Sequence, residues 1–456
     1  MIDWTENGNW SSVNAYVHSD YGWFHVYAFT MTIGMLVAIA ASGFIFWRRK
    51  IPIDGLFYGA IVIIPVSLFG ASFFGKLNAE APGVNANGVG FWGLFAFWNS
   101  GMAIHGGVYC GSTVGMIIFY FIGRKPRVSL WTYMDAIIPN ILLGQAIGRW
   151  GNFFNAEVTG APVGNITSGT GNFLKWLPDF ITDNTQAIYH GEQTIINGIT
   201  YGSGDIAQMS PIFIYESFWL TISWIIIYFV MPGFGKWISK KPWKLYPDNF
   251  KINVRNSFLY FFTRKNQYKE NSYIDIWNKA YYTKYDFELS KEYSEKINFF
   301  LMNKKNKTEL VKVFGTTNII TIKWNLGKML NKINNPDKYL MTKSGSQAGA
   351  YFFAWNIVRF VLELQRPDDH LFIMFQKTLS LAIIFLTAMI GLALIISVNT
   401  FVPYLFRKEN FLYEKEFISN NTNDQVKKMK NVIKKSDKQL IAEQKAKQKL
   451  EKLKKK

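Results

Sequence analysis

The sequence predicts an all-α polytopic membrane protein with seven transmembrane helices, an N-terminus outside the cell and a C-terminus in the cytoplasm. Two observations carry this prediction. Several apolar runs are long enough to cross a hydrocarbon core of ~30 Å, which needs about 20 residues, and basic residues gather in every second connection between them. Of the 456 residues, 49% are hydrophobic and 17% are aromatic. No soluble fold needs so many apolar runs of this length.

Hydropathy places the seven predicted spans at about 24–47, 55–75, 101–123, 129–149, 211–232, 346–364 and 371–399. The first run follows an acidic leader with Asp3 and Glu6 and is too long for a signal peptide, so we expect a helix that is retained. The fourth and sixth runs are the least apolar, because they carry Asp135, and Arg359 with Glu363. We expect Asp135 to cap the fourth span. Charges at membrane depth are costly, so Arg359 and Glu363 indicate a functional site.

The orientation follows from the basic residues. Clusters follow spans one, three, five and seven, at Arg48–Lys50, Arg124–Arg127, Lys236–Lys241 and in the Lys-rich tail. All four lie on one side if there are seven spans, and that side is cytoplasmic. The segment 161–209 then lies outside. It is rich in Gly, Asn, Thr and Ser, with Lys175 as its single Lys or Arg, and predicts a small extracytoplasmic cap of turns and short strands.

The formal charge of +19 is concentrated in two segments. Residues 236–345 hold 22 Lys and Arg against 9 Asp and Glu, and residues 426–456 hold 13 Lys against 3 acids. We therefore divide the chain into a membrane domain, 1–235, which includes the cap, a basic cytoplasmic insert, 236–345, spans six and seven, 346–400, and a basic cytoplasmic tail, 401–456. The insert is compatible with a small folded module. The tail is expected to attract anionic inner-leaflet lipid, by about 1 kcal/mol per basic residue, although a charged tail without a specific role is equally compatible. No nucleic acid is expected as a partner.

No metal or cofactor is expected. The five histidines are scattered, and no metal-ligand spacing, phosphate-binding glycine loop or Ser-His-Asp arrangement occurs. The single cysteine, Cys110, cannot form an intramolecular disulfide and is expected to be a small packing residue within the third span.

The segment Gly148–Gly160, GRWGNFFNAEVTG, follows the outer half of span four. It combines Arg149, Asn152, Asn155 and Glu157 with glycines, which permit sharp turns and close approach of backbone and substrate. Arginine suits phosphate, because its planar guanidinium offers paired donors. The alternative is a helix end that is stabilised by an Arg–Glu ion pair.

Two further polar clusters are predicted at the same membrane face. His105 stands beside Gly106 and Gly107 where span three begins, and an imidazole can take a proton from a thiol or hydroxyl. A hydrogen-bonded packing role for this histidine is the alternative. At the outer end of span six, Arg359, Glu363 and Arg366 are spaced four and three residues apart and so share one helix face. Tyr27 and Glu216 also fall near the outer ends of their spans.

The segment GRWGNFFNAEVTG resembles the signature of the bacterial prolipoprotein diacylglyceryl transferase family, G-R-x-G-N-F-x-N-x-E-x-x-G, at all eight specified positions. His105–Gly107 and Arg359–Arg366 resemble the family's H-G-G and R-F-x-x-E-x-x-R blocks, and Tyr27 falls where the family has a tyrosine. The resemblance covers about 1–235 and 345–400.

The sequence departs from the family pattern at two places. Where the family commonly has an Arg in a G-A-R stretch, this chain has Ser72, and Lys76 one turn later is a possible substitute. Before span five the family often reads R-H-P-S-Q-L-Y-E, whereas this chain reads M-S-P-I-F-I-Y-E and lacks the basic residues.

The resemblance implies transfer of the diacylglyceryl group of phosphatidylglycerol to the lipobox cysteine of prolipoprotein signal peptides. A thioether forms and glycerol phosphate leaves, as the first step of lipoprotein maturation in the cell membrane. A thiol reacts as its thiolate, so His105 is the candidate base. Arg149 and Arg359 are expected to hold the headgroup and stabilise the departing charge. The residues expected to bind or orient the substrate are Tyr27, Asn152, Asn155, Glu157, Gly160, Glu363 and Arg366.

Two alternatives come from other functional classes. A transporter or lipid flippase also carries polar residues in its spans, but these are expected near the midplane and often in repeated halves. A scaffold that binds inner-leaflet lipid or RNA through the basic insert is the second alternative. The predicted position of the polar clusters near one membrane face favours the transferase.

Overall fold

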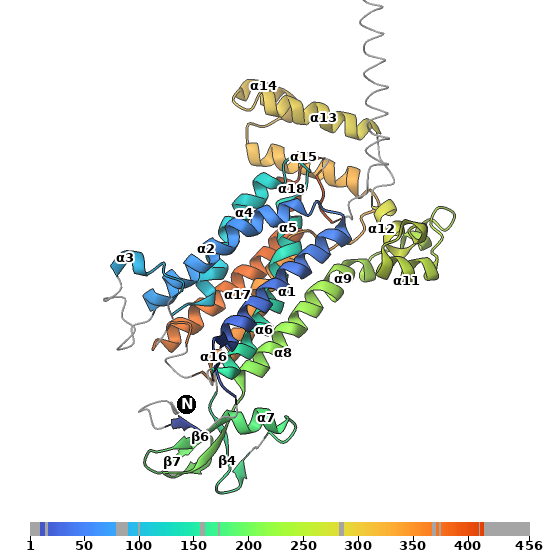
Figure 1. Cartoon of the computed structure of the whole chain (residues 1–456). Coiled ribbons are helices and arrows are strands. Elements are labelled where there is room, and N and C mark those ends of the chain that lie inside the picture. Colours follow the sequence, from blue (N-terminus) through green and yellow to red (C-terminus); the bar gives the residue numbers. More distant parts are fainter. Residues whose placement is uncertain are drawn as a thin grey trace, which may run out of the picture.

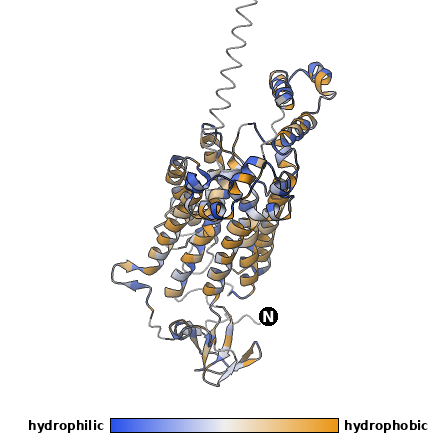
Figure 2. Cartoon of the chain, turned by 90° about the vertical axis from the view of Figure 1, so that its right-hand side faces the viewer, coloured by the Kyte–Doolittle hydropathy of each residue, from blue (hydrophilic) through white to orange (hydrophobic). Residues whose placement is uncertain are grey.

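The computed structural model describes residues 10–13, 17–78, 90–98, 101–155, 160–171, 174–281, 287–366, 371–373, 375–409 and 411–414. These residues form a bundle of long helices with a small β-region at one end and shorter helices at the other (Figure 1). Coloured by hydropathy, the bundle is predominantly hydrophobic, and hydrophilic segments gather beyond it (Figure 2). Glu157 and the tail from residue 415 onward lie outside the described residues.

Five helical stretches of the described chain are long and apolar enough to cross a membrane. Four are single helices: α1 (Val26–Arg49), α2 (Asp54–Asn78), α4 (Ile104–Ile122) and α17 (Lys377–Thr400). The fifth, Ile212–Leu245, contains α8 (Ile212–Ile225), a π-helical turn η4 (Ile226–Val230), α9 (Met231–Ile238) and α10 (Pro242–Leu245). They correspond to the first, second, third, fifth and seventh predicted spans.

The fourth and sixth predicted spans are helical but do not reach the length and apolarity of a membrane-crossing helix. The fourth is divided into α5 (Leu130–Ile137), a 3-10 turn η2 (Ile138–Asn140) that contains Pro139, and α6 (Ile141–Phe154). The sixth is α16 (Ser346–Glu363). Eleven of the 18 residues of α16 are buried, against four of the 24 in α1. The sixth span is therefore less apolar because it packs mainly on protein.

Small residues let the helices approach closely. A Cβ atom added at Gly34 of α1 would lie 2.5 Å from the carbonyl oxygen of Gly144 in α6. One added at Gly70 of α2 would lie 2.8 Å from the carbonyl oxygen of Gly106 in α4. Such contacts between backbones are typical of helix pairs in membranes, where packing rather than the hydrophobic effect drives association.

The segment 161–209 forms turns and short strands, as the sequence predicts. Together with β1 (Trp10–Ser12) it builds an antiparallel sheet in the order β1-β6-β9-β4-β5. The other strands of this sheet are β4 (Pro162–Asn165), β5 (Thr170–Gly171), β6 (Gln186–Tyr189) and β9 (Ile206–Met209). The pair β7 (Thr194–Ile196) and β8 (Ile199–Tyr201) forms a hairpin beside it, and α7 (Asp179–Thr182) and η3 (Asp183–Thr185) precede β6. Tyr201, Ala207 and Met209 are buried in the core of this region.

The described part of the insert is helical. Its elements are α11 (Val254–Thr263), η5 (Asn266–Tyr268), α12 (Tyr273–Ala280), α13 (Phe287–Met302), α14 (Lys307–Phe314) and α15 (Ile319–Asn334). Helix α15 is fixed to the chain that follows α17. The rings of Trp324 and Tyr404 lie 4.8 Å apart, and Tyr404 belongs to α18 (Val402–Leu405). The remaining short elements are α3 (Gly90–Gly93), β2 (Asp20–Tyr21) and β3 (Phe24–His25).

Asp135 caps a different helix from the one expected. Its carboxylate accepts hydrogen bonds from the backbone N–H groups of Gly345 at 2.7 Å and Ala348 at 3.0 Å. These groups belong to the N-terminus of α16, where unpaired donors and the helix dipole favour a carboxylate. The sequence does not predict this partner, because Gly345 is 210 residues from Asp135 along the chain.

Candidate active site

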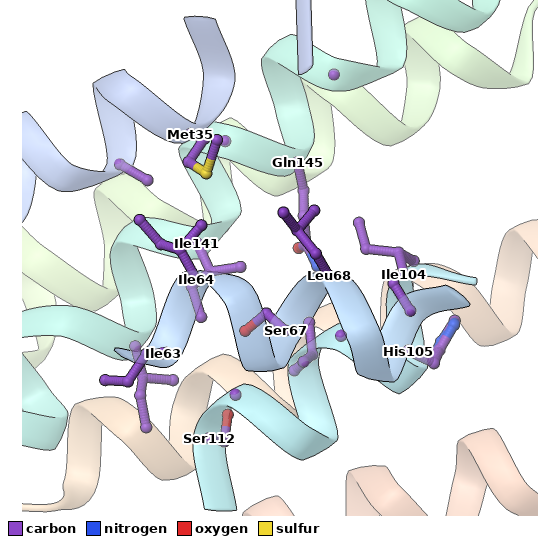
Figure 3. A pocket seen from close by; sticks show the side chains of 18 of the residues that line it. Met35, Ile63, Ile64, Ser67, Leu68, Ile104, His105, Ser112, Ile141 and Gln145 are labelled. Carbon is purple, nitrogen blue, oxygen red and sulfur yellow. The ribbon is translucent and has the colours of Figure 1, made fainter. Parts of the chain in front are cut away.

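A cavity of about 820 Å³ lies between α1, α2, α4, α5 and α6. Its lining is largely aliphatic, with Met35, Ile63, Leu68, Ile104 and Ile141 among the side chains shown in Figure 3. This volume is in the range of cavities that hold small ligands, which occupy about 300–1,000 Å³.

The cavity is long. Both His105 and Phe119 of α4 line it, and they are fourteen residues apart on one helix. At a rise of 1.5 Å per residue this separation is about 21 Å, a large part of a hydrocarbon core of ~30 Å. Ser67, Ser112 and Gln145 are the isolated polar side chains along its labelled walls (Figure 3). An apolar cavity of this length suits an extended hydrocarbon chain.

One end of the cavity is cationic. Arg149 of α6, Arg359 of α16 and Arg366, three residues beyond α16, all line it beside His105. Tyr27 and Asn152 line the same cavity, and the Arg149 Nη1 lies 3.4 Å from the Asn152 Oδ1. Six of the ten predicted site residues thus meet at one place, from four separate parts of the sequence.

Two buried carboxylates hold the three guanidinium groups. Glu216 of α8 forms an ion pair with the Arg149 Nη2 at 2.9 Å and accepts a hydrogen bond from the Arg366 Nη2 at 2.6 Å. Glu363 lies 2.8 Å from the Arg359 Nε, and its carboxylate also accepts from the backbone N–H of Phe372. Both glutamate side chains have no exposed surface. Neither is part of the cavity lining, so the acids stand behind the guanidinium groups.

The charge of this group favours an anion. Three guanidinium groups and two carboxylates sum to a net charge of +1, and the cationic groups are the ones that reach the cavity. A buried charge is stable only when it is paired, and the two glutamates supply partial pairing. Guanidinium groups bind phosphate through paired hydrogen bonds. This end of the cavity is therefore suited to a phosphate group.

His105 packs among aromatic rings. Its ring stacks on Trp355 at 4.6 Å between centroids and meets the edge of Phe372 at 4.2 Å. It is 5% exposed, and its Nε2 has no hydrogen-bond partner among the described residues. The alternative of a hydrogen-bonded packing histidine is therefore not supported on the Nε2 side. Figure 3 shows the ring at one end of the labelled lining.

The glycines of the signature serve helix packing. A Cβ at Gly148 would lie 2.7 Å from the Met31 sulfur, and one at Gly151 would lie 2.4 Å from the Thr30 hydroxyl oxygen and 2.9 Å from the Tyr27 ring. The sequence predicts close approach of backbone and substrate at these glycines. In the structure α1 approaches both of them, and Gly148 also lines the cavity. The same close packing places Tyr27 next to the arginine-bearing helix.

The other predicted residues lie at the edges of the site. Asn155 is the C-cap residue of α6 and is outside the cavity lining. Gly160 donates its N–H to the Ser210 carbonyl at 2.7 Å, and a Cβ there would lie 2.8 Å from the Ile212 side chain. Close approach at Gly160 is therefore an approach of α8, not of the cavity.

Lys76 does not take the place of the missing family arginine at the cavity. Its Nζ donates to the carbonyl oxygens of Gly93 at 2.9 Å and Ala96 at 2.6 Å, and to the Ser72 hydroxyl at 3.0 Å. Lys76 is buried and outside the cavity lining. It fixes the segment after α3 to α2.

Glu216 pairs with two of the arginines of the site, yet the sequence predicts it only as a polar residue near the outer end of its span. That position, beside Tyr215, is the sequence feature that indicates a place in the site.

Residues 20–246 match the sequence model of a family described as prolipoprotein diacylglyceryl transferase. Over 224 residues the chain is 33% identical to the phosphatidylglycerol–prolipoprotein diacylglyceryl transferase of Ureaplasma urealyticum, with 44% of this chain and 59% of that protein covered. It is 34% identical over 231 residues to the enzyme of the same name from Mycoplasmoides gallisepticum, with 45% and 57% covered. It is 40% identical over 134 residues to that from Oceanobacillus iheyensis, with 29% and 38% covered. The chain thus spans about three fifths of the first two relatives.

Proposed function

We propose, from the match of residues 20–246 to the sequence model of the prolipoprotein diacylglyceryl transferase family, that this chain transfers the diacylglyceryl group of phosphatidylglycerol to the lipobox cysteine of prolipoproteins. The observation that carries the proposal is the junction of an apolar cavity of about 820 Å³ with three guanidinium groups at one end. A phospholipid has this same division into apolar chains and an anionic headgroup.

The proposed chemistry uses the groups at that junction. The His105 Nε2 accepts the proton of the cysteine thiol, and the thiolate attacks the glyceryl carbon that bears the phosphate ester. A carbon–sulfur bond forms, the carbon–oxygen bond breaks, and glycerol phosphate leaves with the electron pair. Arg149 and Arg359 hold the phosphate and stabilise its added charge, because fixed charges in a site that excludes water act strongly.

The remaining predicted residues are assigned supporting roles. Tyr27 and Asn152 contact the headgroup from the cavity wall, and Arg366 shares the phosphate with the other guanidinium groups. Glu363 orients Arg359 and Arg366 from behind. Asn155, Glu157 and Gly160 contribute to binding of the signal peptide.

We further propose that all seven helical stretches cross the cell membrane, with the N-terminus outside, the β-region outside as a cap and the basic segments in the cytoplasm. The enclosed position of α16 supports this, because a helix that faces protein tolerates charge at membrane depth. The active site then faces the outer side, where a precursor cysteine emerges. Anionic inner-leaflet lipid would contact the basic tail.

A transporter or flippase is the second candidate. It requires a polar path across the membrane, whereas the charged groups of the described cavity lining gather at one end and the rest is almost entirely apolar. This distribution favours an enzyme that binds the acyl chains of a lipid in the apolar part of the cavity and its headgroup at the cationic end.

The assay uses purified chain, phosphatidylglycerol labelled in its acyl chains and a lipobox peptide. The expected product is a peptide that carries the label in a thioether. The control peptide has the lipobox cysteine replaced by serine. Flipping of labelled lipid in vesicles without formation of a thioether would favour the transporter instead.

His105→Gln is expected to lower the rate of transfer by about 10²–10⁴-fold, the usual contribution of a general base, while binding of phosphatidylglycerol is retained. The matched control is Cys110→Ala, on the same helix but outside the cavity lining. Transfer rates and equilibrium lipid binding are measured for both. An unchanged rate for His105→Gln would remove this histidine from the mechanism.

A further inference from the structure

Helix α11 of the insert presents its apolar side outward. Val254, Phe258 and Phe262 are spaced four residues apart, and they are 77%, 65% and 64% exposed. Phe261, on the same side, is 38% exposed. Residues spaced by four form one stripe along a helix. In a soluble module such a stripe would face the core.

The orientation of α11 is fixed by its other side. The Asn256 side chain donates to the Glu270 carbonyl at 3.0 Å, and the Ser257 hydroxyl accepts from the Tyr273 backbone N–H at 2.8 Å. Tyr260 on that side has no exposed surface. The polar face is thus bound to the protein, and the helix cannot rotate to bury its phenylalanines without breaking these bonds.

The exposed stripe continues the apolar surface of the membrane bundle. The guanidinium carbon of Arg48, in the last turn of α1, lies 4.7 Å from the ring centroid of Phe261 and 5.7 Å from that of Phe44. Phe44 and Trp47 of α1 are each 53% exposed. Figure 1 places α11 beyond α9, where the chain leaves the bundle. The helix therefore lies at the level where a membrane-crossing helix ends.

The charges along the segment 251–269, which contains α11, are of one sign, and the exposed Glu270 follows it. Residues 251–269 contain five basic residues and no acidic one. Of these, Lys251, Arg255 and Lys265 are exposed. Phospholipid headgroups attract such residues, and an amphipathic helix with basic flanks and an aromatic face binds in the plane of a membrane surface.

We propose that α11 is an interfacial anchor, whose stripe of Val254, Phe258, Phe261 and Phe262 inserts into an anionic lipid leaflet at the end of α1. This anchor holds the insert against the membrane. The proposal rests on the bundle crossing a membrane and does not depend on the transfer reaction.

The test uses the full chain with Cys110→Ala, reconstituted in vesicles of phosphatidylcholine and phosphatidylglycerol. A nitroxide label is placed at Phe258→Cys or Phe262→Cys. Phe57→Cys, 57% exposed on α2, is the lipid-facing reference, and Met302→Cys, 83% exposed at the end of α13, is the water-facing control. The measured quantity is the accessibility of each label to oxygen and to a water-soluble nickel chelate.

We expect the labels at 258 and 262 to be more accessible to oxygen than to the nickel chelate. The label at 57 should behave in the same way, and the label at 302 in the opposite way. Higher accessibility to nickel would mean that the stripe lies in water, and low accessibility to both would mean that a second copy or another protein covers it. Either outcome would overturn the anchor. Labels at unchanged depth in vesicles of phosphatidylcholine alone would overturn the anionic part of the proposal. Label depth is independent of turnover, so this test and the transfer assay fail separately.

Discussion

Glu216 connects more of the site than any residue of the signature segment. Its two carboxylate oxygens bind Arg149 of α6 and Arg366, just after α16, which lie on either side of the insert in the sequence. The sequence predicts the meeting of His105, Arg149, Arg359 and Arg366, because each falls at the same end of its span. It does not predict which glutamate pairs with which arginine, since pairing between helices depends on how each helix is rotated about its axis.

Glu216→Gln is expected to destabilise the protein and reduce transfer. The amide keeps the shape of the side chain but removes its charge, which leaves three buried guanidinium groups with one carboxylate. Loss of one partner from a buried pair typically costs about 3–5 kcal/mol. The midpoint of thermal unfolding in detergent and the rate of transfer are the measurements. Glu192→Gln, at an exposed glutamate of the β-region, is the control. Equal melting of the two variants would contradict a structural role for the Glu216 charge.

At the scale of elements, the apolar helices are predictable and their contacts are not. An apolar run of about 20 residues is a local property, so five predicted spans recur as membrane-length helices. The fourth and sixth predicted spans do not recur as membrane-length helices. The 3-10 turn η2 interrupts the fourth, and polar side chains lower the hydropathy of the sixth. Gly148 and Gly151 show a second limit. A glycine predicts close approach, but one sequence does not say whether a substrate or another helix approaches.

Gly34→Ala is expected to weaken the packing of α1 on α6. The added methyl group would lie 2.5 Å from a backbone oxygen of Gly144, which cannot move aside as a side chain can. Overpacking of this kind typically costs about 1–3 kcal/mol. Because Tyr27 and Arg149 are carried by these helices, transfer should fall as well.

Gly43→Ala on the same helix is the matched control for that substitution. Its Cβ would meet only flexible side-chain atoms of Leu56 and Ile53, at 3.7 and 3.8 Å. Thermal unfolding is followed by size-exclusion chromatography after heating. If the two alanine variants lose their folded peak at the same temperature, close contact between α1 and α6 is not a source of stability.

At the scale of the whole molecule, the cavity is the feature that no motif predicts. Its walls come mainly from α1, α2, α4, α5 and α6, and most of the lining residues are ordinary aliphatic side chains. An isoleucine in the sequence of one helix does not indicate whether the neighbouring helices fill the space beside it or leave a cavity. The polar end was predictable because charge at membrane depth is rare, whereas the apolar part was not.

Ala60→Phe is expected to shorten the cavity. Ala60 lines it on α2, and a phenyl ring there would occupy space that we assign to an acyl chain. Transfer from long-chain phosphatidylglycerol should fall several-fold, while transfer from a short-chain analogue should be retained. Ile61→Phe, at the neighbouring position that is 70% exposed and outside the lining, is the control. Equal loss with both chain lengths would mean that the acyl chains lie elsewhere.

The bridging of Arg149 and Arg366 by Glu216 also has a consequence for biosynthesis. Arg149 and Glu216 leave the ribosome before the insert, and Arg366 follows Glu216 by 150 residues. At ~5–20 residues per second this interval is roughly 8–30 s. During that time the nascent chain holds a neutral Arg149–Glu216 pair and an open third position. The insert is translated in the interval, so the cationic end of the cavity is completed only when the sixth helical stretch packs against the earlier ones.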